Sequence, residues 1–149
     1  MAKFTPTATY DDVNLILRLY DMRREDRMRR ARSWFVANFH ASTLEDFQAV
    51  CPPGSEENAS FRMVTSYWEM VSSFLRAGVL NPELFFESNR ELLLVYVRIE
   101  KIVPVWREAT KDPFQYHNLE QIAQKYAAWM NDRAAGSYEA FADRMRNLR

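Results

Sequence analysis

The sequence predicts an all-α protein, a single helical bundle of about six or seven helices with a long N-terminal helix. At 149 residues the chain has the length of one domain, and it can bury a sizeable core without disulfides or a structural metal. It has only three Gly and six Pro, most of them between segments whose apolar residues recur at helical spacing. We find no repeat, low-complexity tract or linker, so we expect one domain over residues 1–149, with residues 1–9 as an N-terminal arm.

The first element is predicted to be one continuous helix from Tyr10 to Phe39. Thr9 offers a capping hydroxyl, acidic residues follow in the first turn, and no Gly or Pro interrupts the chain before Pro52. On a helical wheel, the stripe expected to face the core consists of Val13, Leu17, Tyr20, Met28, Ala31, Phe35 and Phe39.

The middle of the chain carries clear start and stop signals. The pattern that begins at Ser42 is a capping box, which predicts a short helix to about Val50. A third helix is expected to start near Ser55 and to end at Gly78, because glycine favours the left-handed conformation that follows many helices. Asn81, followed directly by proline, predicts the start of another short helix.

The segment after that helix has the composition of a buried strand but the spacing of a helix. We predict one helix that continues through Pro104 with a kink, because proline leaves the carbonyl four residues earlier without its partner. Arg98 and Lys101 are expected to point away from its apolar face. That face comprises Leu92, Val95, Tyr96, Ile99, Ile102, Val103 and Trp106.

The last two helices are predicted from Asn118, as a cap, to Gly136, and from Ser137 onward. The four tryptophans fall one on each of the four major predicted helices. We expect aromatic side chains at this spacing to fill the core, with a ligand cavity between the helices as the alternative. The tryptophans are Trp34, Trp68, Trp106 and Trp129.

The composition excludes the common catalytic and cofactor-binding sites. The three glycines lie too far apart for a phosphate-binding loop, and Cys51, His40 and His117 are too few for a structural zinc site. Glu87 and Glu91, four residues apart, would hold a cation only weakly. We therefore expect no metal, no cofactor and no catalytic residue; whether the protein is an enzyme stays open, with the balance against it.

The location expected from the sequence is the cytoplasm. The first ten residues lack the apolar region of a secretion signal, and the longest apolar run, Leu92–Val97, is too short to span a membrane. A single cysteine, Cys51, forms no intramolecular disulfide and suits a reducing compartment.

The N-terminal helix carries the candidate interaction surface. Arg23, Arg27 and Arg30 form a stripe along one flank, where guanidinium groups could bind phosphate or an acidic partner. The alternative is a solvated face on which Glu25 and Asp26 pair with arginines four residues further on. Nucleic acid is disfavoured, because the chain has no net charge and no reading motif.

The same helix has apolar residues almost all round its first half. Leu15, Leu19 and Met22 point away from the expected core stripe. Such a helix is either enclosed within the bundle or covered by a second subunit, so a homodimer is one expectation.

Three stretches of the chain, Tyr67–Leu84, Val103–Arg107 and Phe114–Ala123, carry a recognisable pattern. It consists of an aromatic-rich helix that ends in a glycine turn, an Asn-Pro helix start, a proline-containing helix that closes with arginine, and a Tyr-x-Asn-aliphatic-Glu helix entry. Over about Phe61–Trp129 the chain resembles a family of uncharacterised bacterial all-helical proteins. The resemblance implies a helical domain with no established activity and supplies no catalytic residues.

Together these observations favour a non-enzymatic protein-interaction or structural module, whose partner is another protein or a second copy. The alternative is a regulator that binds a small ligand or nucleic acid through the arginine-rich face of the first helix.

Overall fold

A computed structural model describes residues 7–148 and confirms the all-α class. Nine helices and no strand lie within these residues. The count exceeds the prediction because two of the predicted helices are each divided in two. In order, the helices are α1 (Tyr10–Arg24), α2 (Asp26–Asn38), α3 (Leu44–Val50), α4 (Glu56–Arg76), α5 (Pro82–Phe86), α6 (Glu91–Ile99), α7 (Val103–Thr110), α8 (His117–Arg133) and α9 (Ser137–Asn147).

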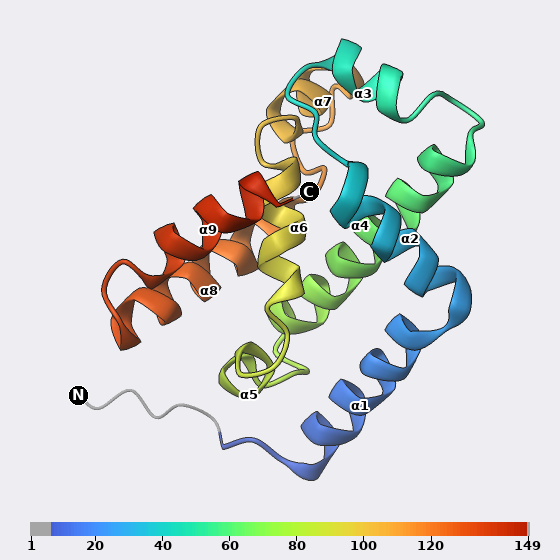
Figure 1. The fold of residues 1–149 in the computed structure, drawn as a ribbon. Helices are drawn as coiled ribbons and strands as arrows, with labels where there is room; N and C mark the ends of the chain where they lie inside the picture. The colour runs from blue at the N-terminus through green and yellow to red at the C-terminus, as the bar shows by residue number, and fades with distance from the viewer. Residues whose placement is uncertain (1–6, 149) are drawn as a thin grey trace.

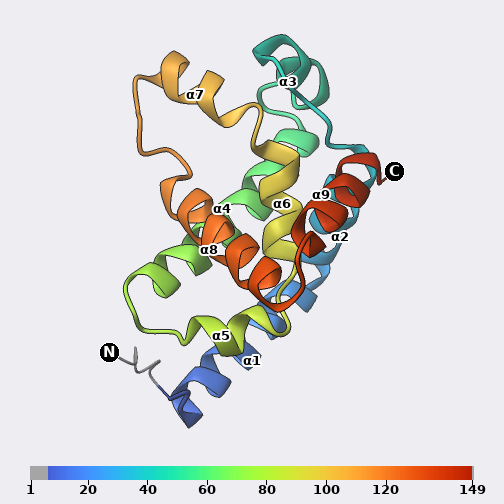
Figure 2. The same cartoon turned by 90° about the vertical axis from the view of Figure 1, so that its left-hand side faces the viewer.

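Two helices, α4 and α6, form the centre of the molecule. Helices α2 and α8 pack against α4, and helices α8 and α9 pack against α6 (Figure 1). Helices α3 and α7 lie together at one end, and α5 lies towards the other (Figure 2). Helix α1 lies at the edge of the molecule and meets α2 at an elbow, so one of its sides has no neighbouring helix among those of the described part of the chain.

Aromatic side chains fill much of the core, as predicted. The centre of the Phe61 ring lies 4.8 Å from that of Phe39 and 5.2 Å from that of Trp106, and the rings of Phe47 and Trp106 meet edge to face with their centres 4.8 Å apart. These rings join α2, α3, α4 and α7 into one apolar cluster, in which edge-to-face and tilted contacts are favourable. Trp68 is fully buried.

Helices α4 and α5 begin at the caps that the sequence predicts, and α3 begins one residue later than its predicted capping box, with Thr43 as the cap in place of Ser42. In each, the side chain of the capping residue accepts a hydrogen bond from the backbone N–H three positions later, as expected for Ser, Thr and Asn. The capping residues are Thr43, Ser55 and Asn81, and the distances are 3.0, 3.1 and 3.0 Å.

The start of α8 differs from the prediction. Asn118 does not cap this helix; the cap comes from Glu69 on α4, whose carboxylate accepts the backbone N–H groups of Asn118 and Leu119 at 3.1 and 2.8 Å. A negative charge at a helix N-terminus is favourable, and here it also ties α8 to α4.

The long N-terminal helix is broken at Glu25, contrary to prediction. Glu25 has extended backbone angles, φ −59° and ψ 142°, and its carboxylate accepts the backbone N–H of Met28 at 3.1 Å. The N–H groups of Arg27 and Met28 lower the pKa of Glu25. Glu25 therefore caps a new helix, although Glu is not among the residues usually preferred there.

The chain also turns between α6 and α7 instead of continuing as one kinked helix. Pro104 lies in the first turn of α7, where the missing N–H of proline breaks no helical hydrogen bond. The predicted apolar face is otherwise confirmed: Leu92, Val95 and Ile99 are fully buried, while Tyr96 is half-buried.

Arg98, predicted to point away from the core, is buried with 5% of its surface exposed. Its guanidinium donates hydrogen bonds to the backbone carbonyls of Val36 and Phe39, at the end of α2. It also donates to those of Met145 and Leu148, at the end of α9. One cation thus holds the negative ends of two helices, where the carbonyls lack helical partners.

Candidate interaction surface

The apolar stripe predicted to face the core from α1 instead faces outward. Tyr10, Val13, Leu17 and Tyr20 are exposed to 78%, 39%, 56% and 45%. We call these four residues the α1 stripe. The placement corrects the prediction for Val13, Leu17 and Tyr20.

The break at Glu25 explains this correction. A single helical wheel assumes that the same side of the helix faces the core along its whole length. That assumption holds for the second half, where Met28, Ala31 and Phe35 are buried as predicted, but not for the first half. Because α1 and α2 are separate helices, each presents its own face to the core. Leu19 is the buried apolar residue of α1, at 3% exposure.

Polar contacts hold the inner face of α1 against the rest of the molecule. The Asp12 carboxylate accepts the N–H of Thr9 and that of Asn81, both at 2.7 Å. These two bonds lower the pKa of Asp12. Further along, the Tyr67 hydroxyl on α4 donates to the Leu19 carbonyl at 2.6 Å. The outward direction of the stripe is therefore fixed by bonds on the inner face of the helix.

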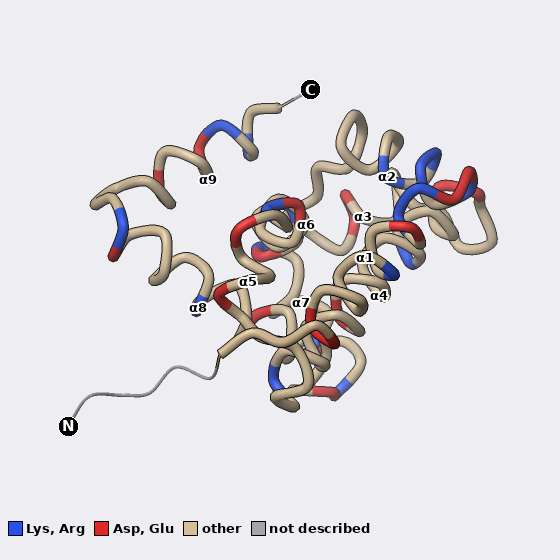
Figure 3. The backbone as a smooth tube through the Cα atoms, turned by 90° about the horizontal axis from the view of Figure 1, so that it is seen from below, with Lys and Arg blue, Asp and Glu red and all other residues tan. Residues whose placement is uncertain are grey.

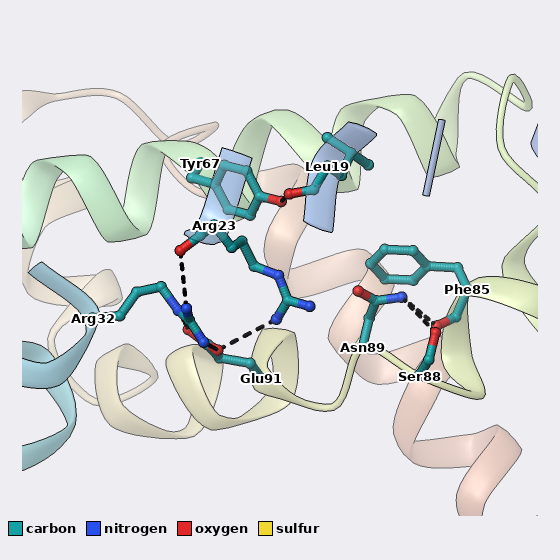
Figure 4. Close-up of polar contacts among 8 residues, drawn as sticks. All are labelled: Leu19, Arg23, Arg32, Tyr67, Phe85, Ser88, Asn89 and Glu91. Carbon is teal, nitrogen blue, oxygen red and sulfur yellow. Dashed lines mark hydrogen bonds and ion pairs between the residues drawn. The ribbon is translucent and has the colours of Figure 1, made fainter. Parts of the chain in front are cut away.

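An ion cluster made of Arg23, Arg32 and Glu91, called here the elbow cluster, holds the junction of α1 and α2 (Figure 4). Arg32 donates to the two oxygens of Glu91 at 2.8 and 2.5 Å, and to the Arg23 carbonyl at 3.0 Å. The Arg23 guanidinium lies 3.4 Å from Glu91 and 5.3 Å from the centre of the Trp68 ring. The hydrogen bonds to Glu91 raise the pKa of Arg32.

The residues predicted to form an interaction surface fall into a buried group and an exposed group in the structure. Arg23 and Leu19 are buried, and Leu15 is half-buried against the core, so these three are not available to a partner. Met22, Arg27 and Arg30 are exposed, but the break separates Met22 from the two arginines. The predicted arginine stripe of Arg23, Arg27 and Arg30 does not exist as one face.

The outer face of α2 carries a groove that the sequence analysis did not single out. Two adjoining hollows share Arg29 and Ser33; the first also includes Asp26 and Arg30, and the second runs towards the end of α9. The second is lined by Arg29, Arg32, Ser33, Val36, Ala37, Glu91 and Leu148. We call the two hollows together the α2 groove.

Residues considered for metal or thiol chemistry have other roles in the structure. Glu87 pairs with Arg133 at 3.2 Å, and Glu91 belongs to the elbow cluster. No group of three or more His, Cys, Asp and Glu residues within 7–148 is placed to hold a metal ion. Burial raises the pKa of the Cys51 thiol to about 11, so it is protonated at neutral pH.

Comparison with known proteins gives a family and no function. The family model DUF4760, described as a domain of unknown function, matches residues 8–126, from the start of α1 into α8. This confirms the resemblance predicted over Phe61–Trp129 and extends it to the N-terminal helices. No curated protein and no solved structure matches the chain. Among the helices within 7–148, none has the length and apolar character needed to cross a membrane.

Proposed function

We propose a protein-interaction role for this chain, which belongs to the DUF4760 family, a domain of unknown function. The observation that carries the proposal is the α1 stripe, a line of apolar side chains that residues 7–148 leave exposed. The proposal places the protein in the cytoplasm, where its free Cys51 would remain reduced.

The spacing of the α1 stripe favours another helix as its partner. Its residues lie three, four and three positions apart, the heptad spacing by which one helix packs along a second. Contiguous exposed apolar patches on small proteins are often contact sites, because burial of such surface stabilises association by roughly 25 cal/mol per Å².

We take the partner helix to be α1 of a second copy. A two-fold interface must be complementary to itself, and an antiparallel pairing of two α1 helices meets this condition. It sets Tyr10 of each copy opposite Tyr20 of the other, and Val13 opposite Leu17. Tyrosine rings would then close both ends of the contact around an aliphatic centre. The outward direction of the stripe, fixed by the contacts of Asp12, Leu19 and Arg23, leaves it accessible for this pairing.

Sedimentation velocity over a concentration series tests the proposal. We expect the wild-type protein to sediment as a dimer at high micromolar concentration and Leu17→Glu to sediment as a monomer, because the change places a charge in the centre of the contact. The matched control is Val79→Glu, at a residue 62% exposed on the turn after α4, against 56% for Leu17. We expect this control to dimerise like the wild type.

Two results would contradict self-association through the α1 stripe. One is a wild-type protein that stays monomeric throughout the series. The other is a Leu17→Glu variant that dimerises as strongly as Val79→Glu. Circular dichroism of both variants shows whether the fold is retained.

A further inference from the structure

We infer that the α2 groove binds an acidic segment of a partner protein. Arg29 and Arg30 would hold a carboxylate or phosphate group of the segment, with the Ser33 hydroxyl beside them. The wall near Val36 and Leu148 would take a neighbouring apolar side chain. The inference rests on the proposed function only in that the partner is a protein, because the groove and the α1 stripe are different surfaces.

The first argument is that two of the three acids beside the groove, Glu25 and Glu91, are already engaged. Glu25 accepts a backbone N–H of α2 as its cap. Glu91 is shared between two arginines of the elbow cluster. Asp26 is the one remaining acid that lines the groove, against Arg29, Arg30 and the bound Arg32. Basic residues accordingly gather along α2 and its junction with α1 (Figure 3).

The second argument is that the groups facing the groove are available. Arg29, Arg30 and Ser33 are exposed, and their side chains form no hydrogen bond or ion pair with a described residue, although the charge of Arg30 contributes to lowering the pKa of Glu25. The pairing of Asp26 with these arginines, the alternative from the sequence, is not formed. Ser33 lies one turn after Arg29 and Arg30, so the three side chains share one side of the helix. Two guanidinium groups and a hydroxyl suit the oxygens of a carboxylate or phosphate.

The third argument comes from the rigid and apolar parts of the groove. Arg32 is held by three hydrogen bonds, so the groove has a fixed wall where α2 meets α6. Beyond it, Val36, Ala37 and Leu148 provide an apolar surface. A ligand that fills the groove therefore needs both an anionic group and an apolar one, as an acidic peptide with aliphatic residues has.

The same features favour protein over nucleic acid. Nucleic-acid binding requires several phosphate contacts, and the groove offers only two arginines free of ion pairs with described residues. No aromatic side chain lines it for stacking against a base. The chain as a whole has no net charge.

Fluorescence anisotropy at low salt tests the inference with defined probes. They are a short labelled peptide rich in glutamate and leucine, the same peptide with phosphoserine in place of glutamate, and one with lysine instead. Inorganic phosphate and a labelled single-stranded oligonucleotide complete the set. The test variant is Arg29→Glu/Arg30→Glu, and its control is Arg62→Glu/Lys125→Glu. The control changes two exposed residues elsewhere by the same net charge.

We expect the glutamate or phosphoserine peptide to bind, the lysine peptide not to bind, and affinity to fall with added salt. The test variant should lose at least about tenfold in affinity, and the control should lose much less. Leu17→Glu should bind the peptide like the wild type, because peptide binding does not require self-association. The two proposals can therefore be tested separately.

Several results would overturn the inference. They are no binding of either acidic peptide, an equal loss in both double variants, or inorganic phosphate binding as tightly as the phosphopeptide. Tighter binding of the oligonucleotide that depends on Arg29 and Arg30 would assign the groove to nucleic acid instead. If no acidic peptide binds the groove but the wild type still dimerises through α1, the proposed function is retained and only the present inference is rejected.

Discussion

Replacement of Arg98 by methionine is the most informative test of how the helices are held together. Methionine keeps an unbranched apolar side chain and removes only the guanidinium. The change deletes four hydrogen bonds, of 2.7–3.0 Å, to carbonyls at the ends of α2 and α9. None of these partners is a carboxylate, so the loss leaves no unpaired negative charge behind.

The expected cost follows from the burial of the four carbonyls. The Phe39 carbonyl lies in the only fully buried bond and would lose its partner without access to water, at a cost of about 1–3 kcal/mol. The other three bonds are partly buried, so water can replace the lost donor in part. Burial lowers the pKa of Arg98, because the charged form is costly to remove from water, and this cost offsets some of the gain. We expect a net loss of about 3 kcal/mol in the free energy of unfolding, or roughly 6–12 °C in melting temperature.

Urea unfolding followed by circular dichroism measures this loss. Arg98→Lys should recover only part of it, because an ammonium group cannot reach four carbonyls spread around a planar guanidinium. Lys101→Met, an exposed position one turn later, is the control and should change stability by less than about 0.5 kcal/mol. A loss for Arg98→Met as small as that of the control would refute the assigned role.

Three further predictions follow from the site. Glu91→Gln should destabilise the fold by about 2–3 kcal/mol, because two largely buried arginines lose their counter-charge. Glu87→Gln, which breaks an exposed ion pair, should cost under about 0.5 kcal/mol. Equal losses for the two variants in urea unfolding would contradict the stabilising role of the elbow cluster. The pKa of Asp12 is lower in the folded protein than its value of about 3.9 in the unfolded chain, so the ionised carboxylate stabilises the fold at pH values above 3.9. This stabilisation is lost as the pH falls through the pKa of Asp12 in the folded protein. Asp12→Asn should therefore be less stable than the wild type at pH 7, with a gap in urea midpoint that closes in acid; a gap that persists or widens there would disprove this. With a pKa of about 11, the Cys51 thiol should react with a thiol reagent far more slowly at pH 8 in folded protein than in urea, and equal rates would show that it is not protected.

Local signals in the sequence predicted most of the helix positions. The caps at Ser55 and Asn81 each use a side chain to satisfy a nearby backbone N–H, and the cap of α3 lies at Thr43, one residue after the predicted Ser42. The apolar spacing after Leu92 likewise indicated helix over strand. Such interactions join residues three or four positions apart, so they can be read without knowledge of the fold.

The misplaced features depend on contacts between residues far apart in the chain. Glu25 is not a usual cap, and the elbow that it starts is held by contacts between α2 and Glu91, 59 residues after Arg32. Arg98 finds its acceptors 47 to 62 residues away. A charged residue next to an apolar helix face is normally predicted to be exposed. Only the fold shows that the ends of two helices meet at Arg98.

The residues of the candidate surface are separated in the structure for a related reason. The sequence indicated that α1 is apolar almost all round and that arginines are concentrated nearby, and both features are present in the structure. It could not indicate which apolar side is enclosed, because that choice is made by Asn81, Tyr67 and Glu91, which bind the inner side. The α2 groove was missed because its apolar wall includes Leu148, at the far end of the chain.

Two-dimensional ¹H–¹⁵N NMR at low and high protein concentration tests most directly whether the α1 stripe is a contact surface. We predict that amide signals of residues 10–20 shift or broaden with concentration, and that those of the buried helix α6 do not. The same spectra of Leu17→Glu should show no such change. Concentration-dependent shifts that map to another face, or spectra that are the same at both concentrations, would contradict it.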